Sequence, residues 1–154
     1  MAFALPAKLA GALTEREAIA DALYRAVLAF DHADEALLLS AMTEDISFEI
    51  LGASHNGIPE IKAAVFDRVS KLDTTHFISN IRISIESVTT AKMTCSATAQ
   101  HVRPGKGFEP GPNKFTSGGL YLCDVVKVDD LWKIKSWKVN VVWVDGDPTV
   151  MNGE

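Results

Sequence analysis

The stretch Thr74–Arg103, TTHFISNIRISIESVTTAKMTCSATAQHVR, decides the fold of this chain. In its second half, one phase of an alternating pattern holds Met93, Cys95, Ala97, Ala99 and His101. The intervening positions are polar. Alternation with a period of two predicts a β-strand with one buried face. We therefore expect His101 to face the interior beside two alanines, whose small side chains leave room for a ligand.

The first half of the stretch predicts the partner strand of a β-hairpin. Its apolar face is marked by Ile81, Ile83 and Ile85. His76 is out of phase with this face, and a β-bulge near Ser79–Asn80 would bring it into phase. With a turn at Thr89–Thr90, His101 would lie opposite Ile78 and diagonal to His76, at roughly 7–8 Å. Two histidines at this separation could contact opposite ends of a small substrate, and a structural role at the rim of the sheet is the alternative.

The composition is typical of a globular chain with one hydrophobic core. The chain has 154 residues, of which 47% are hydrophobic and 23% charged, and this length fits one domain. Its formal net charge of −5 argues against nucleic acids and anionic membranes as partners, because these select basic patches. No apolar run reaches the roughly 20 residues that span a bilayer, and the N-terminus lacks the pattern of a signal peptide. We expect a cytoplasmic protein in which Cys95 and Cys123 are free buried thiols.

Three helices are predicted in the first half of the chain. The capping box Thr14–Glu17 begins a helix that ends near Phe30. Asp31 follows, and a carboxylate at this end of a helix opposes the helix dipole at a cost of a few tenths to about 1 kcal/mol. Asp31 is therefore either a functional residue with a cationic partner or an ordinary solvent-exposed aspartate in a loop. A second helix is expected over residues 35–42, and Pro59 begins the third.

Strands fill the second half. Besides the hairpin, strands are predicted over residues 46–50, 119–128 and 131–143. The segment 104–119, rich in glycine and proline, is interpreted as a lid with Phe108 or Phe115 as its apolar contact, and a long hairpin connection is the alternative. The last strand carries an apolar face of Trp137, Val139, Val141 and Trp143. We expect a homodimer to cover that face.

This order of elements predicts an α+β fold. Three N-terminal helices would pack on a strongly curved, mainly antiparallel sheet that encloses a cone-shaped cavity. The domain is expected to span residues 14–145, after an irregular arm (1–13) and before a polar tail (146–154).

The chain resembles the SnoaL-like and scytalone dehydratase-like group of the nuclear-transport-factor-2-like superfamily. The resemblance covers about residues 13–145. It rests on the order and spacing of EREAIADALYRAVLAFDHADEALLLSAMTEDISFEI, GIPEIKAAV, TTHFISNI and LWKIKSWKVNVVWVDGD. It implies the cone-shaped α+β barrel of that superfamily.

The resemblance also implies a catalytic core. In scytalone dehydratase-like enzymes, an aspartate at the end of the first helix and two strand histidines form this core, and Asp31, His76 and His101 match them. Asp31 would then accept a hydrogen bond from an imidazole and hold its tautomer. Neither a metal nor a cofactor is implied.

The residues around this core depart from the group. Its two carbonyl-binding tyrosines appear here as Phe30 and Ile50, and its serine and asparagine on a later strand appear as Gly119 and Tyr121. The expected substrate-binding residues are therefore Phe30, Ile50, Ala97, Ala99, Gly119 and Tyr121.

Two functions fit the sequence. The first is a cofactor-free dehydratase, isomerase or cyclase acting on a largely apolar polyketide- or terpenoid-like molecule in secondary metabolism. In this function one histidine removes a proton and the other protonates an oxygen. Glu49 is an alternative base, although its outward phase argues against it. The second is a non-catalytic small-molecule-binding or dimerisation domain, in which Trp132, Trp137 and Met93 could fill the cone.

Overall fold

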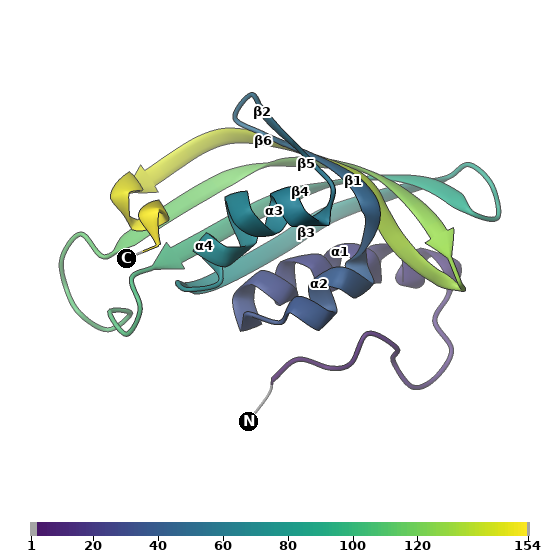
Figure 1. The fold of residues 1–154 in the computed structure, drawn as a ribbon, viewed down its shortest axis with the longest axis horizontal. Coiled ribbons are helices and arrows are strands. Elements are labelled where there is room, and N and C mark those ends of the chain that lie inside the picture. Colours follow the sequence, from purple (N-terminus) through teal and green to yellow (C-terminus); the bar gives the residue numbers. More distant parts are fainter. Residues whose placement is uncertain (1–2, 154) are drawn as a thin grey trace.

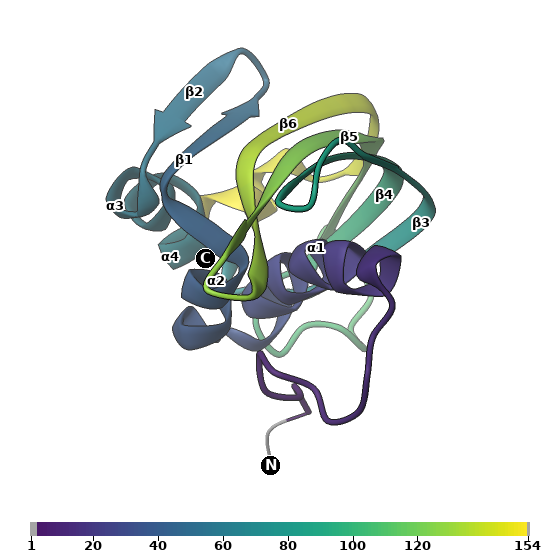
Figure 2. The same cartoon turned by 90° about the vertical axis from the view of Figure 1, so that its right-hand side faces the viewer.

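The computed structural model describes residues 3–153 and shows helices packed on one curved sheet (Figure 1, Figure 2). The helices are α1 (Glu15–His32), α2 (Glu35–Ala41), α3 (Ile58–Ile61), the π-helical turn η1 (Lys62–Phe66), α4 (Asp67–Val69) and the 3-10 helix η2 (Pro148–Asn152). The strands are β1 (Met42–Ile50), β2 (Ala53–Asn56), β3 (Asp73–Ile85), β4 (Thr90–Val102), β5 (Lys114–Val128) and β6 (Leu131–Gly146).

All six strands belong to one sheet in the order β2-β1-β6-β5-β4-β3. β1 and β6 are parallel, and every other pair of neighbours is antiparallel. Figure 2 shows the sheet curling around the helices, which cover its concave face. The predicted α+β class with a mainly antiparallel sheet is thus confirmed. None of the described helices is long and apolar enough to cross a membrane.

The helix α1 starts at the predicted capping box. The backbone N–H of Glu17 donates to Thr14 Oγ1 at 3.2 Å, and the N–H of Thr14 donates to Glu17 Oε2 at 2.7 Å. The helix continues past Phe30 and ends at His32, where Ala33 adopts a left-handed φ of 53°. Asp31 therefore lies in the last helical turn rather than in a loop.

The β3–β4 hairpin contains the predicted bulge. The pairing shifts between Ser79 and Arg82, and Asn80 has a left-handed φ of 56°. Because of this extra residue, His76 and Ile83 both lie opposite buried residues of β4. The bulge thus turns His76 to the concave face.

The predicted turn of this hairpin was wrong. Residues 86–89 make the connection, and the N–H of Glu86 donates to the carbonyl of Thr90 at 2.9 Å, so Thr90 already belongs to β4. As a result, His101 pairs with Thr74, and its partner moves from position 78 to position 74. An even displacement leaves every side chain on its face. His101 consequently stays on the face of His76 and remains its diagonal neighbour.

The segment predicted as a lid is a loop only in its first part, because residues 114–119 are strand. β5 starts inside it, and Phe115 pairs with both β4 and β6. The remaining loop covers residues 103–113, and Phe108 in it is fully exposed. Phe108 therefore cannot be the apolar contact of a lid, whereas Phe115 belongs to the sheet.

Two further segments differ from the prediction. Residues 51–57, between the predicted strand 46–50 and Pro59, form the turn and second strand of the β1–β2 hairpin, because Leu51 and Gly52 take the positive φ angles (51° and 78°) of a tight hairpin turn. His55 is half-buried in β2 and stacks on Phe48 with ring centroids 6.3 Å apart. The expected third helix is divided into α3, η1 and α4. Of its apolar positions, Ile61, Val69 and Leu72 are buried, whereas Val65 is half-buried.

The segment predicted as a polar tail contains a packed helix. It forms η2, in which Val150 is completely buried. Asp147 caps this helix by accepting the N–H of Thr149 at 2.9 Å, and it forms an ion pair with Arg103 at 3.2 Å. The chain therefore remains packed on the domain beyond residue 145.

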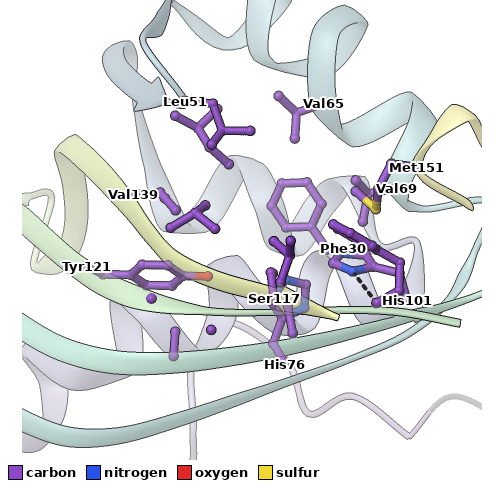
Figure 3. Close-up of a pocket in the computed structure, with 18 of the residues that line it drawn as sticks. Phe30, Leu51, Val65, Val69, His76, His101, Ser117, Tyr121, Val139 and Met151 are labelled. Atoms are coloured by element: carbon purple, nitrogen blue, oxygen red, sulfur yellow. Dashed lines mark hydrogen bonds between the residues drawn. The ribbon is translucent and has the colours of Figure 1, made fainter. Parts of the chain in front are cut away.

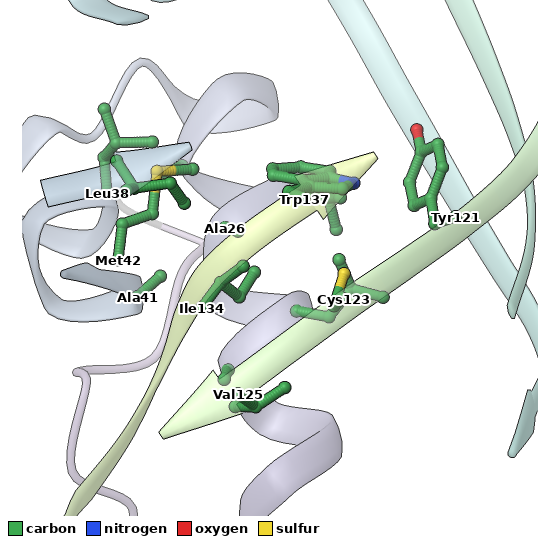
Figure 4. Packing of buried hydrophobic residues seen from close by; sticks show 14 of the residues in the cluster. Ala26, Leu38, Ala41, Met42, Tyr121, Cys123, Val125, Ile134 and Trp137 are labelled. Carbon is green, nitrogen blue, oxygen red and sulfur yellow. The ribbon is translucent and has the colours of Figure 1, made fainter. Parts of the chain in front are cut away.

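The hydrophobic core lies between the helices and the concave face. Figure 4 shows Leu38 and Met42 opposite Ile134, with Cys123 and Val125 on the neighbouring strand. Trp132 and Met93 also belong to the core, at 2% and 1% exposure. Both cysteines are free and buried, as predicted.

Candidate functional site

A cavity of about 360 Å³ opens on the concave face beyond this core (Figure 3). It is lined by Phe30, Phe48, Ile50, Leu51, Val65, Val69, His76, Ala97, Ala99, His101, Phe115, Ser117, Gly118, Gly119, Tyr121, Trp137, Val139, Val141, Val144, Pro148 and Met151. Nearly all of these side chains are apolar. The polar groups on the wall come mainly from the two histidines, Ser117 and Tyr121.

Strand pairing explains why the cavity exists. His76 pairs with Ala99 and Ala99 pairs with Ser117, so these three residues form one row across the sheet. In the next row, Ala97 pairs with Gly119. Small residues in the middle of both rows leave a low floor, and large side chains at the ends form the walls.

Asp31 and His76 form a close pair at the edge of the cavity. His76 Nδ1 lies 2.6 Å from Asp31 Oδ1, and the backbone N–H of His76 donates to Asp31 Oδ2 at 2.9 Å. The two side chains are 9% and 10% exposed. A carboxylate can only accept, so Nδ1 carries the proton in this contact. In the neutral imidazole, the other ring nitrogen, Nε2, keeps its lone pair and can accept a proton.

His101 lies next to His76 on the cavity wall. Their ring centroids are 5.9 Å apart and their planes are nearly perpendicular, at 85°. His101 Nδ1 is 3.3 Å from the carbonyl oxygen of Phe115, which can only accept. Nδ1 is therefore protonated in this contact too, and Nε2 keeps its lone pair.

Burial and the charge of His76 lower the pKa of His101 to about 4, against smaller raising effects of the Phe115 carbonyl and Asp31. Only 5% of the residue is exposed, so a charged imidazolium would lose most of its hydration. His101 is thus neutral near pH 7 and can act there as a hydrogen-bond acceptor.

The structure brings the sequence-predicted residues together. His76 and His101 are on the wall, and Asp31 lies behind His76. The expected substrate-binding residues Phe30, Ile50, Ala97, Ala99, Gly119 and Tyr121 all line the cavity. Glu49 does not line it and instead pairs with Lys138 at 3.2 Å. This position removes Glu49 as an alternative base.

The face expected to be covered by a homodimer is oriented differently. Trp137, Val139 and Val141 line the cavity, and only Trp143 points away from it. The pairing of β5 with β6 shifts at Gly118 and Gly119, so the alternation of β6 breaks before Trp143. Trp132 and Met93 fill the adjacent core without closing the cavity, which leaves room for a ligand.

Sequence reasoning missed several wall residues. Ser117 shares the phase of Gly119 and Tyr121, but it fell inside the predicted loop. Pro148 and Met151 lie in the segment predicted as a polar tail. Alternation could have found Ser117, whereas nothing local indicates that η2 returns to the cavity. Within residues 3–153, no group of three or more His, Cys, Asp or Glu side chains could hold a metal ion.

Comparisons with known proteins agree with this architecture. The family model of the SnoaL-like domain matches residues 11–138. The Terrestric acid biosynthesis cluster protein E of Penicillium crustosum is 45% identical over 146 residues, which cover 94% of each chain.

Solved structures of low sequence identity share the fold. A scytalone dehydratase-like protein from Novosphingobium aromaticivorans has a TM-score of 0.71 at 24% identity, over 86% of this chain and 87% of that one. A hexachlorocyclohexane dehydrochlorinase, LinA type 2, has a TM-score of 0.70 at 16% identity, over 86% of this chain and 88% of that one.

Proposed function

The chain belongs to the SnoaL-like domain family, and from this premise we propose that it is a cofactor-free acid–base enzyme. Its substrate is a largely apolar small molecule of polyketide or terpenoid type, and its reaction is a dehydration, isomerisation or cyclisation. The 45% sequence identity to a protein of a biosynthesis cluster supports a role of this chain in secondary metabolism. A cytoplasmic location is part of the same proposal.

The observation that carries this proposal is the Asp31–His76 pair at the wall of an apolar cavity. Asp31 holds the proton on Nδ1 of His76, so Nε2 presents a lone pair. Nε2 takes a proton from a substrate carbon, and the resulting imidazolium is stabilised by the Asp31 carboxylate. The electron pair of the broken C–H bond forms a C=C bond.

The same imidazolium can complete a dehydration. It returns its proton to the leaving hydroxyl, which departs as water, and His76 is neutral again. Because the pKa of His101 is lowered to about 4, this residue is a poor proton donor near neutral pH. We assign His101 to accept a hydrogen bond from a substrate hydroxyl through Nε2.

Turnover of a pool of cyclic β-hydroxy ketones, followed by mass spectrometry, tests this function. His76→Ala should lower turnover roughly 10²–10⁴-fold, the usual contribution of a general base. His32→Ala is the matched control, because His32 is exposed at the end of α1. Full turnover by a folded His76→Ala variant would exclude the mechanism.

A non-catalytic binding domain is the second candidate. It is favoured by the mostly aliphatic and aromatic wall of the cavity, which could hold an apolar ligand without chemistry. In that case the wild type would bind members of the pool and release them unchanged. The compounds recovered from His76→Ala would then be unchanged as well.

A homodimer also remains part of the proposal. Leu120, Leu122 and Trp143 are 52%, 44% and 49% exposed, and an apolar surface of this kind favours a second copy. Sedimentation velocity of the wild type and of Leu122→Lys tests it. A monomeric wild type at micromolar concentration would contradict the dimer.

A further inference from the structure

One region of the cavity holds two hydrogen-bond donors without acceptors. Tyr121 is 8% exposed, and its hydroxyl forms no hydrogen bond with other residues among 3–153. Nε1 of Trp137 is buried and also lacks an acceptor in that range. The two rings form a T-shaped contact with their centroids 5.3 Å apart. Figure 4 shows the indole nitrogen on the side facing Tyr121. An unsatisfied buried donor costs about 1–3 kcal/mol, so the indole N–H of Trp137 requires an explanation.

The Tyr121 hydroxyl is directed toward the histidines. His76 and Ser117 lie in one cross-strand row, and Tyr121 lies further along β5, from position 117 to 121. That separation is roughly 13 Å at about 3.3 Å per residue. Figure 3 shows the Tyr121 oxygen pointing back along the cavity toward Ser117 and His76. Ala97 and Gly119 occupy the row between them, so no large side chain blocks the path.

We propose that Tyr121, assisted by Trp137, forms an oxygen-binding site, and that the substrate carries a carbonyl oxygen held there. This inference rests on the proposed function for its chemistry, because the carbon next to that carbonyl is the one that His76 deprotonates. The proton moves to Nε2 of His76, and the C–H electron pair forms the C=C bond of an enolate. The Tyr121 O–H donates to the enolate oxygen. Burial raises the pKa of Tyr121 well above its usual range, so the phenol stays protonated and available as a donor.

A ketone and its parent hydrocarbon test the site. Wild type should bind 1-tetralone more tightly than tetralin, which has the same bicyclic skeleton without the carbonyl. Tyr121→Phe keeps the ring and should lose this preference by roughly five- to tenfold, the value of about one hydrogen bond. In Tyr121→Phe, exchange of the α-protons of 1-tetralone for deuterium should also be roughly 10²-fold slower than in the wild type, as for loss of one oxyanion donor. Tyr24→Phe is the matched control, because Tyr24 is 41% exposed on α1.

The infrared carbonyl stretch of bound 1-tetralone gives a second measurement. It should lie at a lower wavenumber in the wild type and His76→Ala than in Tyr121→Phe. In Trp137→Phe, the wavenumber should lie between the values of the wild type and of Tyr121→Phe.

The outcomes separate the oxygen site from the proposed function. If Tyr121→Phe keeps both the ketone preference and the carbonyl shift, the oxygen site is excluded, whatever His76 does. If exchange survives in His76→Ala while the shift depends on Tyr121, the proposed function fails and the oxygen site stands. Equal affinity of the wild type for the two compounds, or binding of neither, also overturns the oxygen site.

Discussion

At the scale of single residues, the position of Asp31 is unfavourable until its partner is considered. A carboxylate in the last turn of a helix faces the negative end of the helix dipole, at a cost of about 0.3–1 kcal/mol. Two hydrogen bonds from His76, one from the backbone and one from the ring, offset this cost. The charge is therefore held where it can stabilise an imidazolium.

Asp31→Asn should disable the base while keeping its shape. An amide can face His76 but supplies no negative charge to the imidazolium, so α-proton exchange of 1-tetralone should slow roughly 10²–10⁴-fold. Asp45→Asn, an exposed position on β1, is the control. Exchange at the wild-type rate in a folded Asp31→Asn variant would show that the pair is only structural.

His101 should make the protein less stable in acid. Its pKa is about 4 in the folded state and about 6.5 in the unfolded chain. Between these values the unfolded state binds the proton and the folded state does not, so the free energy of unfolding falls as the pH drops from 6.5 to 4. The loss amounts to about 3 kcal/mol.

Urea denaturation at pH 4.5, 5.5, 7 and 8 checks this prediction. The stability of His101→Gln relative to the wild type should increase toward acid pH, because the variant lacks the titrating group. A stability difference that does not change with pH would rule out the linkage.

At the scale of the elements, the bend of β5 and β6 depends on two adjacent glycines. The pairing shifts between Gly118 and Gly119. A Cβ on Gly119 would overlap the backbone carbonyl oxygen of Asn140, whereas a Cβ on Gly118 would overlap the indole ring of Trp143. One obstacle is backbone within the sheet, and the other is a half-exposed side chain.

The two glycines should therefore differ in their tolerance of alanine. Gly119→Ala must displace β6, and we expect a loss of about 1–3 kcal/mol, as for an overpacked site. Gly118→Ala only requires Trp143 to rotate and should cost less. Chemical denaturation of both variants measures the difference, and equal losses would show that the backbone overlap does not control this bend.

At the scale of the whole molecule, the cavity is closed by segments far apart in the sequence. The floor of the cavity comes from β4 and β5. Phe30 of α1 and His76 of β3 line one side of it, and η2 forms another wall. Arg103 fixes η2 through Asp147 at 3.2 Å and Thr149 at 2.8 Å. Packing of the C-terminal segment thus couples the stability of the domain to the enclosure of the site.

Val150→Ala should lower the stability of the domain and loosen the enclosure of the cavity. Val150 is 0% exposed, and loss of its buried methyl groups should cost about 1–3 kcal/mol. Val88→Ala is the matched control, because Val88 is 85% exposed in the β3–β4 turn and should stay within about 0.5 kcal/mol. Denaturation gives the stabilities. Stopped-flow release of 1-tetralone should be faster only in Val150→Ala, and unchanged release would separate η2 from the site.

The sequence by itself determined the class of the fold and the composition of the candidate site. Alternation put His101 on a buried face, the capping box set the start of α1, and the bulge near Ser79–Asn80 followed from the phase of His76. These signals are local, because each depends on the geometry of one element. The resemblance to a known family then supplied the role that we propose for Asp31.

Only the tertiary structure decided which surface is the cavity and what closes it. The hairpin register depends on a turn at residues 86–89 that carries no strong turn residues, and the orientation of Trp143 depends on the break at Gly118 and Gly119. The return of η2 and the unpaired donors of Tyr121 and Trp137 exist only once distant strands pack. Contacts between elements distant in sequence are set by the free energy of the whole packed molecule, and local periodicity does not contain that information.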